Sequence, residues 1–203
     1  MELKFDPALD YQQQAIAAVI GAFDGQQTAR TNFEISNANG GGFVFSELGI
    51  RNDINISDKN ILANVNKIQA ANGVDEVQEL QGRQFSVEME TGTGKTYVYL
   101  RTIFELAKTY GLRKFIIVVP SVAIREGVLK GIEMTKAHFQ ALYDNEPFDY
   151  FIYDSKKLGS VRQFAVSDKI QIMVINIQSF QRDIADKDAA EMNDEELKKL
   201  GKV

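Results

Sequence analysis

The segment at residues 91–96, Thr-Gly-Thr-Gly-Lys-Thr, constrains this chain more than any other part of its sequence. It lies between a short strand candidate at residues 85–89 and a segment whose apolar residues have helical spacing. The two glycines permit a turn whose backbone N–H groups converge on an anion, and the positive end of the following helix points at the same place. We therefore expect a phosphate-binding loop between a strand and a helix.

The residues of this loop have separate roles in binding a nucleoside polyphosphate. Lys95 supplies positive charge for the outer phosphates, and the hydroxyl of Thr96 suits a Mg²⁺ ion. We expect both to be catalytic, Thr96 to be the metal ligand, and the whole loop to bind the nucleotide: Thr91, Gly92, Thr93, Gly94, Lys95 and Thr96. The usual pattern has glycine where this chain has Met89. The alternative is a turn with a solvent-exposed lysine.

Strand-like and helix-like patterns alternate after the loop. Residues 115–119 are five apolar residues without alternation, which predicts a strand buried on both faces of a parallel sheet. Residues 122–143 look helical, and residues 149–153 and 170–175 are further strand candidates. This order predicts an α/β fold, with a parallel sheet flanked by helices.

Two helices and a polar loop are expected before the phosphate loop. Apolar spacing predicts a helix over residues 11–23, and a second helix from about residue 58 to 72 with Ser57 as its cap. Asparagines and glycines predict a loop over residues 36–46. Residues 33–82 are too long for a plain connection, so we expect an insertion that flanks the nucleotide site or docks a partner.

The composition excludes several classes of protein. The 203 residues include no cysteine and one histidine, which excludes a thiolate metal site and a multi-histidine centre. No apolar run approaches the roughly 20 residues that span a bilayer, and the N-terminus does not look like a signal peptide, so we expect a cytoplasmic protein without a membrane partner. The net charge of -5 argues against a globally basic nucleic-acid surface but permits a local basic groove.

The order of the motifs resembles that of superfamily 2 helicases and translocases. Residues 89–96 resemble motif I, and residues 11–16 resemble the upstream adenine-reading motif, Tyr-Gln-x-x-Ala-Ile. Residues 118–121 with Arg125 resemble motif Ia, and residues 174–180 resemble the segment around motif Ib. The resemblance therefore extends over several segments in the expected order.

This resemblance implies roles for individual residues. Gln12 is expected to bind adenine through its side-chain amide, the alternative being a solvent-facing glutamine. Ser121, Arg125, Gln178 and Ser179 are expected to contact DNA. The alternatives are a helix cap for Ser121 and a surface charge for Arg125.

A closer resemblance is to the restriction (Res) subunit of type III restriction-modification enzymes, over almost the whole chain. It is carried by "METGTGKTYVYLRTIFEL", "FIIVVPSVAIREGV", "HFQALY" and the earlier segment "NDINISDKNILANVNKIQ". The resemblance implies a RecA-like domain with ATP and Mg²⁺ as cofactors, in a motor that moves along double-stranded DNA before cleavage. It also implies a methyltransferase (Mod) subunit as the partner that reads the DNA sequence.

The expected organisation has three parts. Residues 1–32 form an N-terminal segment with the adenine-reading helix, residues 33–82 form the insertion, and residues 83–203 form a partial RecA-like ATP-binding domain. A helicase motor needs an acidic motif II, and no apolar strand ending in Asp-Glu follows Ile177. We therefore expect an N-terminal fragment that does not turn over ATP efficiently alone.

Two other functions stay open at this point. One is a self-sufficient phosphate-loop kinase or NTPase, with Asp154 at the end of a short apolar strand as its metal acid. The helicase order argues against it, because it places that strand between motifs Ia and Ib. The other is a non-hydrolysing nucleotide-binding module that docks another subunit. His138 lies in a helical stretch, and a structural role is expected for it.

Overall fold

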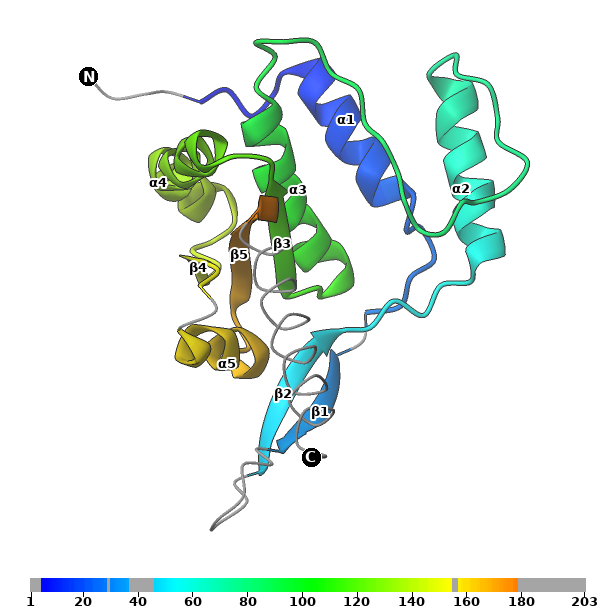
Figure 1. The fold of residues 1–203 in the computed structure, drawn as a ribbon. Coiled ribbons are helices and arrows are strands. Elements are labelled where there is room, and N and C mark those ends of the chain that lie inside the picture. The colour runs from blue at the N-terminus through cyan, green and yellow to red at the C-terminus, as the bar shows by residue number, and fades with distance from the viewer. Residues whose placement is uncertain (1–4, 29, 37–45, 155–156, 179–203) are drawn as a thin grey trace, which may run out of the picture.

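A parallel sheet lies at the centre of the computed structural model, which describes residues 5–28, 30–36, 46–154 and 157–178 (Figure 1). The sheet consists of β3 (Lys114–Val119), β4 (Phe148–Ile152) and β5 (Ile170–Asn176), in the order β3-β5-β4. Helices flank it, which confirms the predicted α/β class and agrees with a RecA-like domain. A separate antiparallel pair is formed by β1 (Arg30–Ser36) and β2 (Ser46–Asn52).

The main core lies between one face of this sheet and two helices, α3 (Lys95–Tyr110) and α4 (Val122–Leu142). Alternate residues of β5 face this core, and Ile170, Ile172 and Val174 are fully buried. Helix α5 (Leu158–Val166) joins β4 to β5, and its Phe164 packs edge-on against Phe151 of β4. Phe148 and Tyr150 of β4 face the main core, so Phe151 points to the other face of the sheet. Helix α5 therefore covers the face opposite the main core.

The N-terminal helices form a second group beside α3. Helix α1 (Asp10–Gly21) packs on α3, and α2 (Asp58–Ala71) packs on α1 (Figure 1). Ser57 caps α2 as predicted, because its Oγ accepts a hydrogen bond of 3.3 Å from the N–H of Asn60. The insertion therefore brings α2 close to the helix that carries Gln12.

The expectation that residues 115–119 form a strand buried on both faces is wrong. The strand exists, but Ile116 and Val118 are 55% and 57% exposed. Among the described residues β3 is an edge strand with β5 on one side, and the two helices of the main core cover only the face that Ile117 and Val119 occupy. The central strand β5 is the one with buried residues on both faces.

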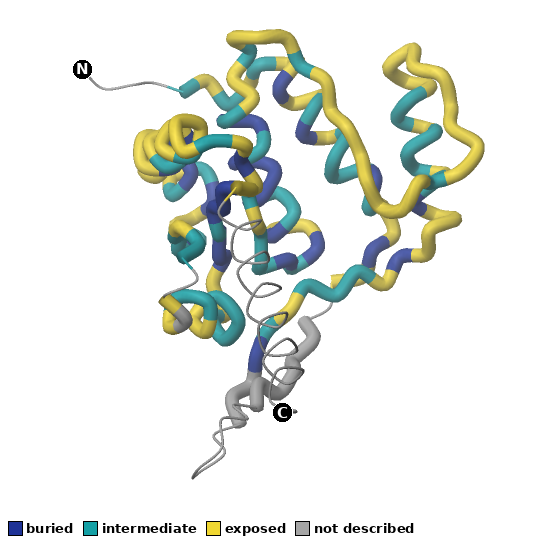
Figure 2. Tube along the Cα trace, viewed as in Figure 1, coloured by how far each residue is buried: buried dark blue, intermediate teal, exposed yellow. Residues whose placement is uncertain are grey.

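The expectation that residues 85–89 form a strand is also wrong. This segment is extended but pairs with no strand of the described chain, and it crosses in front of α1 (Figure 1). Figure 2 shows it exposed along most of its length. Phe85 and Val87 are 40% and 48% exposed. Apolar character alone does not make a strand, because the backbone needs a neighbouring strand to complete its hydrogen bonds.

The other predicted elements agree closely with the observed ones, including α4 and β5. The hairpin of β1 and β2 was not predicted, and neither was α5. Most of the predicted loop at residues 36–46 lies outside the described residues. Within the described part of the chain, none of the helices combines the length and apolar character that crossing a membrane requires.

Candidate functional site

Two glycines with left-handed backbone conformations form the turn before α3. Gly92 has φ 85° and Gly94, the N-cap residue of α3, has φ 83°. L-residues rarely adopt this conformation, so glycine is needed at both positions. The turn leads directly into a 16-residue helix whose first N–H groups have no partners within the helix. Since the turn is exposed, an anion can reach the positive end of α3.

The side chains of the loop turn back onto its own backbone. Lys95 donates a hydrogen bond of 2.7 Å from Nζ to the carbonyl oxygen of Glu90, and Thr93 donates one of 2.7 Å from Oγ1 to the same oxygen. Lys95 is exposed, so its ammonium group is accessible. A phosphate would offer this ammonium group an acceptor with a full negative charge in place of a neutral carbonyl oxygen.

The fold brings Gln12 to this loop. Its side chain is buried, and its Nε2 donates a hydrogen bond of 2.9 Å to the carbonyl oxygen of Thr93. A Cβ atom at Gly94 would lie 2.7 Å from the same nitrogen. Gln12 therefore holds the backbone of the phosphate loop, and adenine binding by Gln12 stays a prediction.

Thr96 lies where α3 approaches α4. Its Cγ2 methyl would be 2.8 Å from a Cβ atom at Gly131 of α4, so glycine permits this close contact. The sequence analysis missed Gly131. The signal for it was a glycine inside a long helix, where glycine costs roughly 1 kcal/mol relative to alanine and needs a reason such as close packing.

The predicted DNA-contacting residues gather at one edge of the sheet. Val119 and Asn176 are paired at the carboxyl ends of parallel strands β3 and β5. Ser121 follows the first strand and Gln178 follows the second. Figure 1 shows that α3 begins at this same edge, so these residues and the phosphate loop share one side of the molecule. Ser179 lies outside the described residues.

Ser121 and Arg125 have local partners on α4. The Oγ of Ser121 accepts a hydrogen bond of 3.3 Å from the N–H of Ile124, so Ser121 is the helix cap. The guanidinium of Arg125 lies 2.9 Å from the carboxylate of Glu126. Because Ser121 follows the carboxyl end of β3, the N-terminus of α4 lies at this edge of the sheet. A helix N-terminus can bind phosphate groups. Contact of Ser121, Arg125 and Gln178 with DNA stays a prediction.

Asp154 and His138 lie in other surroundings. Asp154 follows β4, which β5 separates from β3, and its carboxylate is 3.8 Å from the ammonium of Lys157. No group of three or more His, Asp or Glu residues in the described part of the chain could hold a metal ion.

The Nε2 of His138 is 2.9 Å from the hydroxyl of Tyr97. Burial lowers the pKa of His138, and the positive charge of Arg101 lowers it further. This partly buried position agrees with a structural role for His138.

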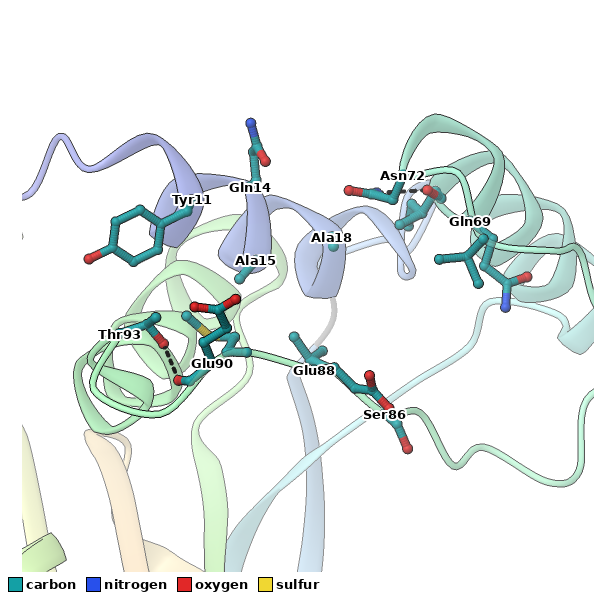
Figure 3. Close-up of a pocket in the computed structure, with 14 residues that line it drawn as sticks. Tyr11, Gln14, Ala15, Ala18, Gln69, Asn72, Ser86, Glu88, Glu90 and Thr93 are labelled. Atoms are coloured by element: carbon teal, nitrogen blue, oxygen red, sulfur yellow. Dashed lines mark hydrogen bonds between the residues drawn. The ribbon is translucent and has the colours of Figure 1, made fainter.

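A cavity of about 760 Å³ adjoins the phosphate loop (Figure 3). Its walls come from α1, from the C-terminal end of α2, and from the extended segment that leads into the loop. Thr93 and Glu90 line the end beside the loop, and Asn72 lines the end formed by α2. Tyr11 also lines the cavity and is 47% exposed, so it does not pack in the core.

Comparison with known proteins places the chain among restriction enzymes. The family described as "Type III restriction enzyme, res subunit" matches residues 7–200. The chain is similar to the EcoPI Res subunit of Escherichia phage P1, with 31% identity over 160 residues, which cover 76% of this chain and 16% of that protein.

Two further relatives have similar names. The EcoP15I Res subunit of Escherichia coli is 35% identical over 112 residues, which cover 53% of this chain and 12% of that protein. The StyLTI Res subunit of Salmonella typhimurium is 37% identical over 109 residues, which cover 45% of this chain and 11% of that protein. The matched region thus spans 16% or less of the length of each of these relatives.

Proposed function

This chain belongs to the family of type III restriction enzyme Res subunits, and on that premise we propose that it forms the ATP-binding part of an ATP-dependent DNA motor. One observation carries the proposal. The two left-handed glycines place an exposed turn, followed by Lys95, at the N-terminus of the long helix α3. That arrangement suits a polyphosphate, because backbone N–H groups, the helix dipole and a lysine act on the same volume.

The residues of the loop fit ATP and Mg²⁺. Gly92 leaves room for phosphate oxygens, because even a Cβ atom at this position would meet nothing within 4 Å. Lys95 would hold the outer phosphates, and Thr96 would supply a hydroxyl oxygen to Mg²⁺. When bound, Mg²⁺ neutralises charge on the phosphate oxygens during phosphoryl transfer to water. Gln12 keeps the loop in position through the carbonyl oxygen of Thr93.

DNA binding is proposed at the carboxyl edge of the sheet. Ser121, Arg125 and Gln178 lie at the edge from which α3 also begins, so a change in the phosphate loop is close enough to affect this surface. For the whole protein we propose movement along double-stranded DNA before cleavage, in a complex with a methyltransferase (Mod) subunit. The names of the three relatives and the family match support this extension.

The test is the affinity of the full chain for MgATP, measured by calorimetry for the unaltered protein and for Lys95→Ala. Loss of one charge-assisted interaction costs about 1.5–3 kcal/mol, so we expect affinity to fall roughly 10- to 100-fold. Lys108→Ala is the matched control, because Lys108 is an exposed lysine in the last turn of the same helix. Equal affinities for Lys95→Ala and Lys108→Ala would contradict the proposal.

A further inference from the structure

Two side chains with hydroxyl groups lie one turn apart on α3, at the end that follows the phosphate loop. Thr96 is the second residue of this helix, and Tyr99 is the fifth. Residues three apart share one face of a helix, so these two side chains are neighbours. Tyr99 packs against the main core, and Thr96 meets α4 at Gly131. The proposed ligand of Mg²⁺ therefore has a phenol beside it.

The hydroxyl of Tyr99 is buried and completes no hydrogen bond within the described part of the chain. Such groups are rare in folded proteins, because an unpaired buried hydroxyl costs free energy, and each one needs an explanation. Burial raises the pKa of Tyr99, and the side chain of Thr96 partly opposes this effect. A hydroxyl lowers the pKa of a phenol in this way only from within hydrogen-bonding reach. Thr96 is therefore placed to become the partner that Tyr99 lacks.

The hydroxyl of Thr96 is not held by its own helix. Two other threonines inside helices, Thr102 and Thr135, each donate a hydrogen bond of 2.8 Å to the carbonyl oxygen four residues earlier in the chain. The fourth residue before Thr96 is Gly92, which belongs to the turn and not to α3. Between these two described residues there is no corresponding hydrogen bond. The proton of the Thr96 hydroxyl is therefore available to Tyr99.

We propose that Tyr99 is a positioning residue for the metal ligand, because its phenol oxygen accepts a hydrogen bond from the hydroxyl of Thr96. The inference rests on the proposed function, in which Thr96 supplies a hydroxyl oxygen to Mg²⁺. A hydroxyl has one proton and two lone pairs, so a proton directed to Tyr99 leaves the lone pairs of Thr96 for the ion. Groups that orient a metal ligand in this way strengthen metal binding without contacting the metal. The same hydrogen bond gives the buried phenol a partner.

The test compares Tyr99→Phe with Tyr97→Phe, which removes a hydroxyl of the same helix that is bonded to His138. Calorimetry on the full chain measures the affinity for ATP with Mg²⁺ and with EDTA, and the ratio of the two affinities reports the contribution of the metal ion. We expect Tyr99→Phe to reduce this ratio about threefold to tenfold, the value of one hydrogen bond, and to leave the affinity in EDTA unchanged. Tyr97→Phe should leave the ratio unchanged.

Two further measurements separate positioning from a structural role. Because the Tyr99 hydroxyl is unpaired in the metal-free chain, Tyr99→Phe should leave the midpoint of urea unfolding unchanged or raise it. Thr96→Val keeps the methyl group that meets Gly131 but lacks the hydroxyl, so in this background Tyr99→Phe should no longer change the affinity ratio. A lower unfolding midpoint, or the same change of the ratio in the Thr96→Val background, would overturn the inference.

The outcomes also distinguish this inference from the proposed function. If Lys95→Ala weakens MgATP binding but Tyr99→Phe and Tyr97→Phe give the same affinity ratio, the role of Tyr99 is wrong and the proposed function stands. If the full chain binds ATP neither with Mg²⁺ nor in EDTA, both are wrong.

Discussion

Replacing Gly94 by alanine tests how the phosphate loop is held in its binding conformation. The substitution has two separate effects. Alanine at φ 83° is strained, which costs about 1–2 kcal/mol. Its Cβ would also lie 2.7 Å from Nε2 of Gln12, so the hydrogen bond to Thr93 must lengthen or break. Loss of that bond adds about 0.5–1.5 kcal/mol.

Gly92 provides the matched comparison. It has nearly the same φ, 85°, but a Cβ atom there would meet nothing within 4 Å. Gly92→Ala should therefore lower the free energy of unfolding by the strain alone, about 1–2 kcal/mol. Gly94→Ala should lower it by about 1 kcal/mol more, because only that substitution displaces Gln12.

Urea unfolding of four proteins separates the two effects: the unaltered chain, Gln12→Ala, Gly94→Ala and the double variant. In the Gln12→Ala background the contact is already absent, so Gly94→Ala should cost only the backbone strain. The cycle should give a coupling free energy of about 1 kcal/mol. Additive effects, together with equal values for Gly92→Ala and Gly94→Ala, would refute the conclusion that Gln12 holds the loop.

Two further predictions concern the surroundings of the loop. Gly131→Ala should lower the free energy of unfolding by about 1–3 kcal/mol in urea titrations, because its Cβ would meet the Thr96 methyl at 2.8 Å. Gly127→Ala is the control: it lies at an open position on the same helix, so it should leave the free energy of unfolding unchanged or raise it. The pKa of His138 is lowered from its usual 6.5 by burial and by Arg101, so the unfolded chain binds the proton first. The free energy of unfolding should therefore fall as the pH drops below about 6.5, and this dependence should be absent in His138→Gln.

Local patterns in the sequence predicted most of the helices and the glycine turn before α3. The helical spacing over residues 122–143 corresponds to α4, and both glycines of residues 91–96 adopt the left-handed conformation of a tight turn. Ser57 and Ser121 cap the helices that follow them. Each of these features is set by neighbours within a few residues, so a single sequence contains the information.

Features that depend on distant partners were not predictable in the same way. Residues 85–89 and 115–119 are both predicted strands, but only the second segment has a strand beside it in the described structure. Even there, exposure of Ile116 and Val118 depends on which helices cover each face. Helix α5 was missed because residues 158–166 were not recognised as the crossover that parallel strands β4 and β5 require.

Gln12 shows why a motif and a contact are different kinds of information. The resemblance implies that Gln12 binds adenine, and the structure shows its amide bound to the backbone of Thr93. The partner of its amide depends on the close approach of α1 to the loop, which Gly94 permits and the sequence does not encode locally. Because this amide donates to the carbonyl oxygen of Thr93, Gln12 links α1 directly to the backbone of the loop.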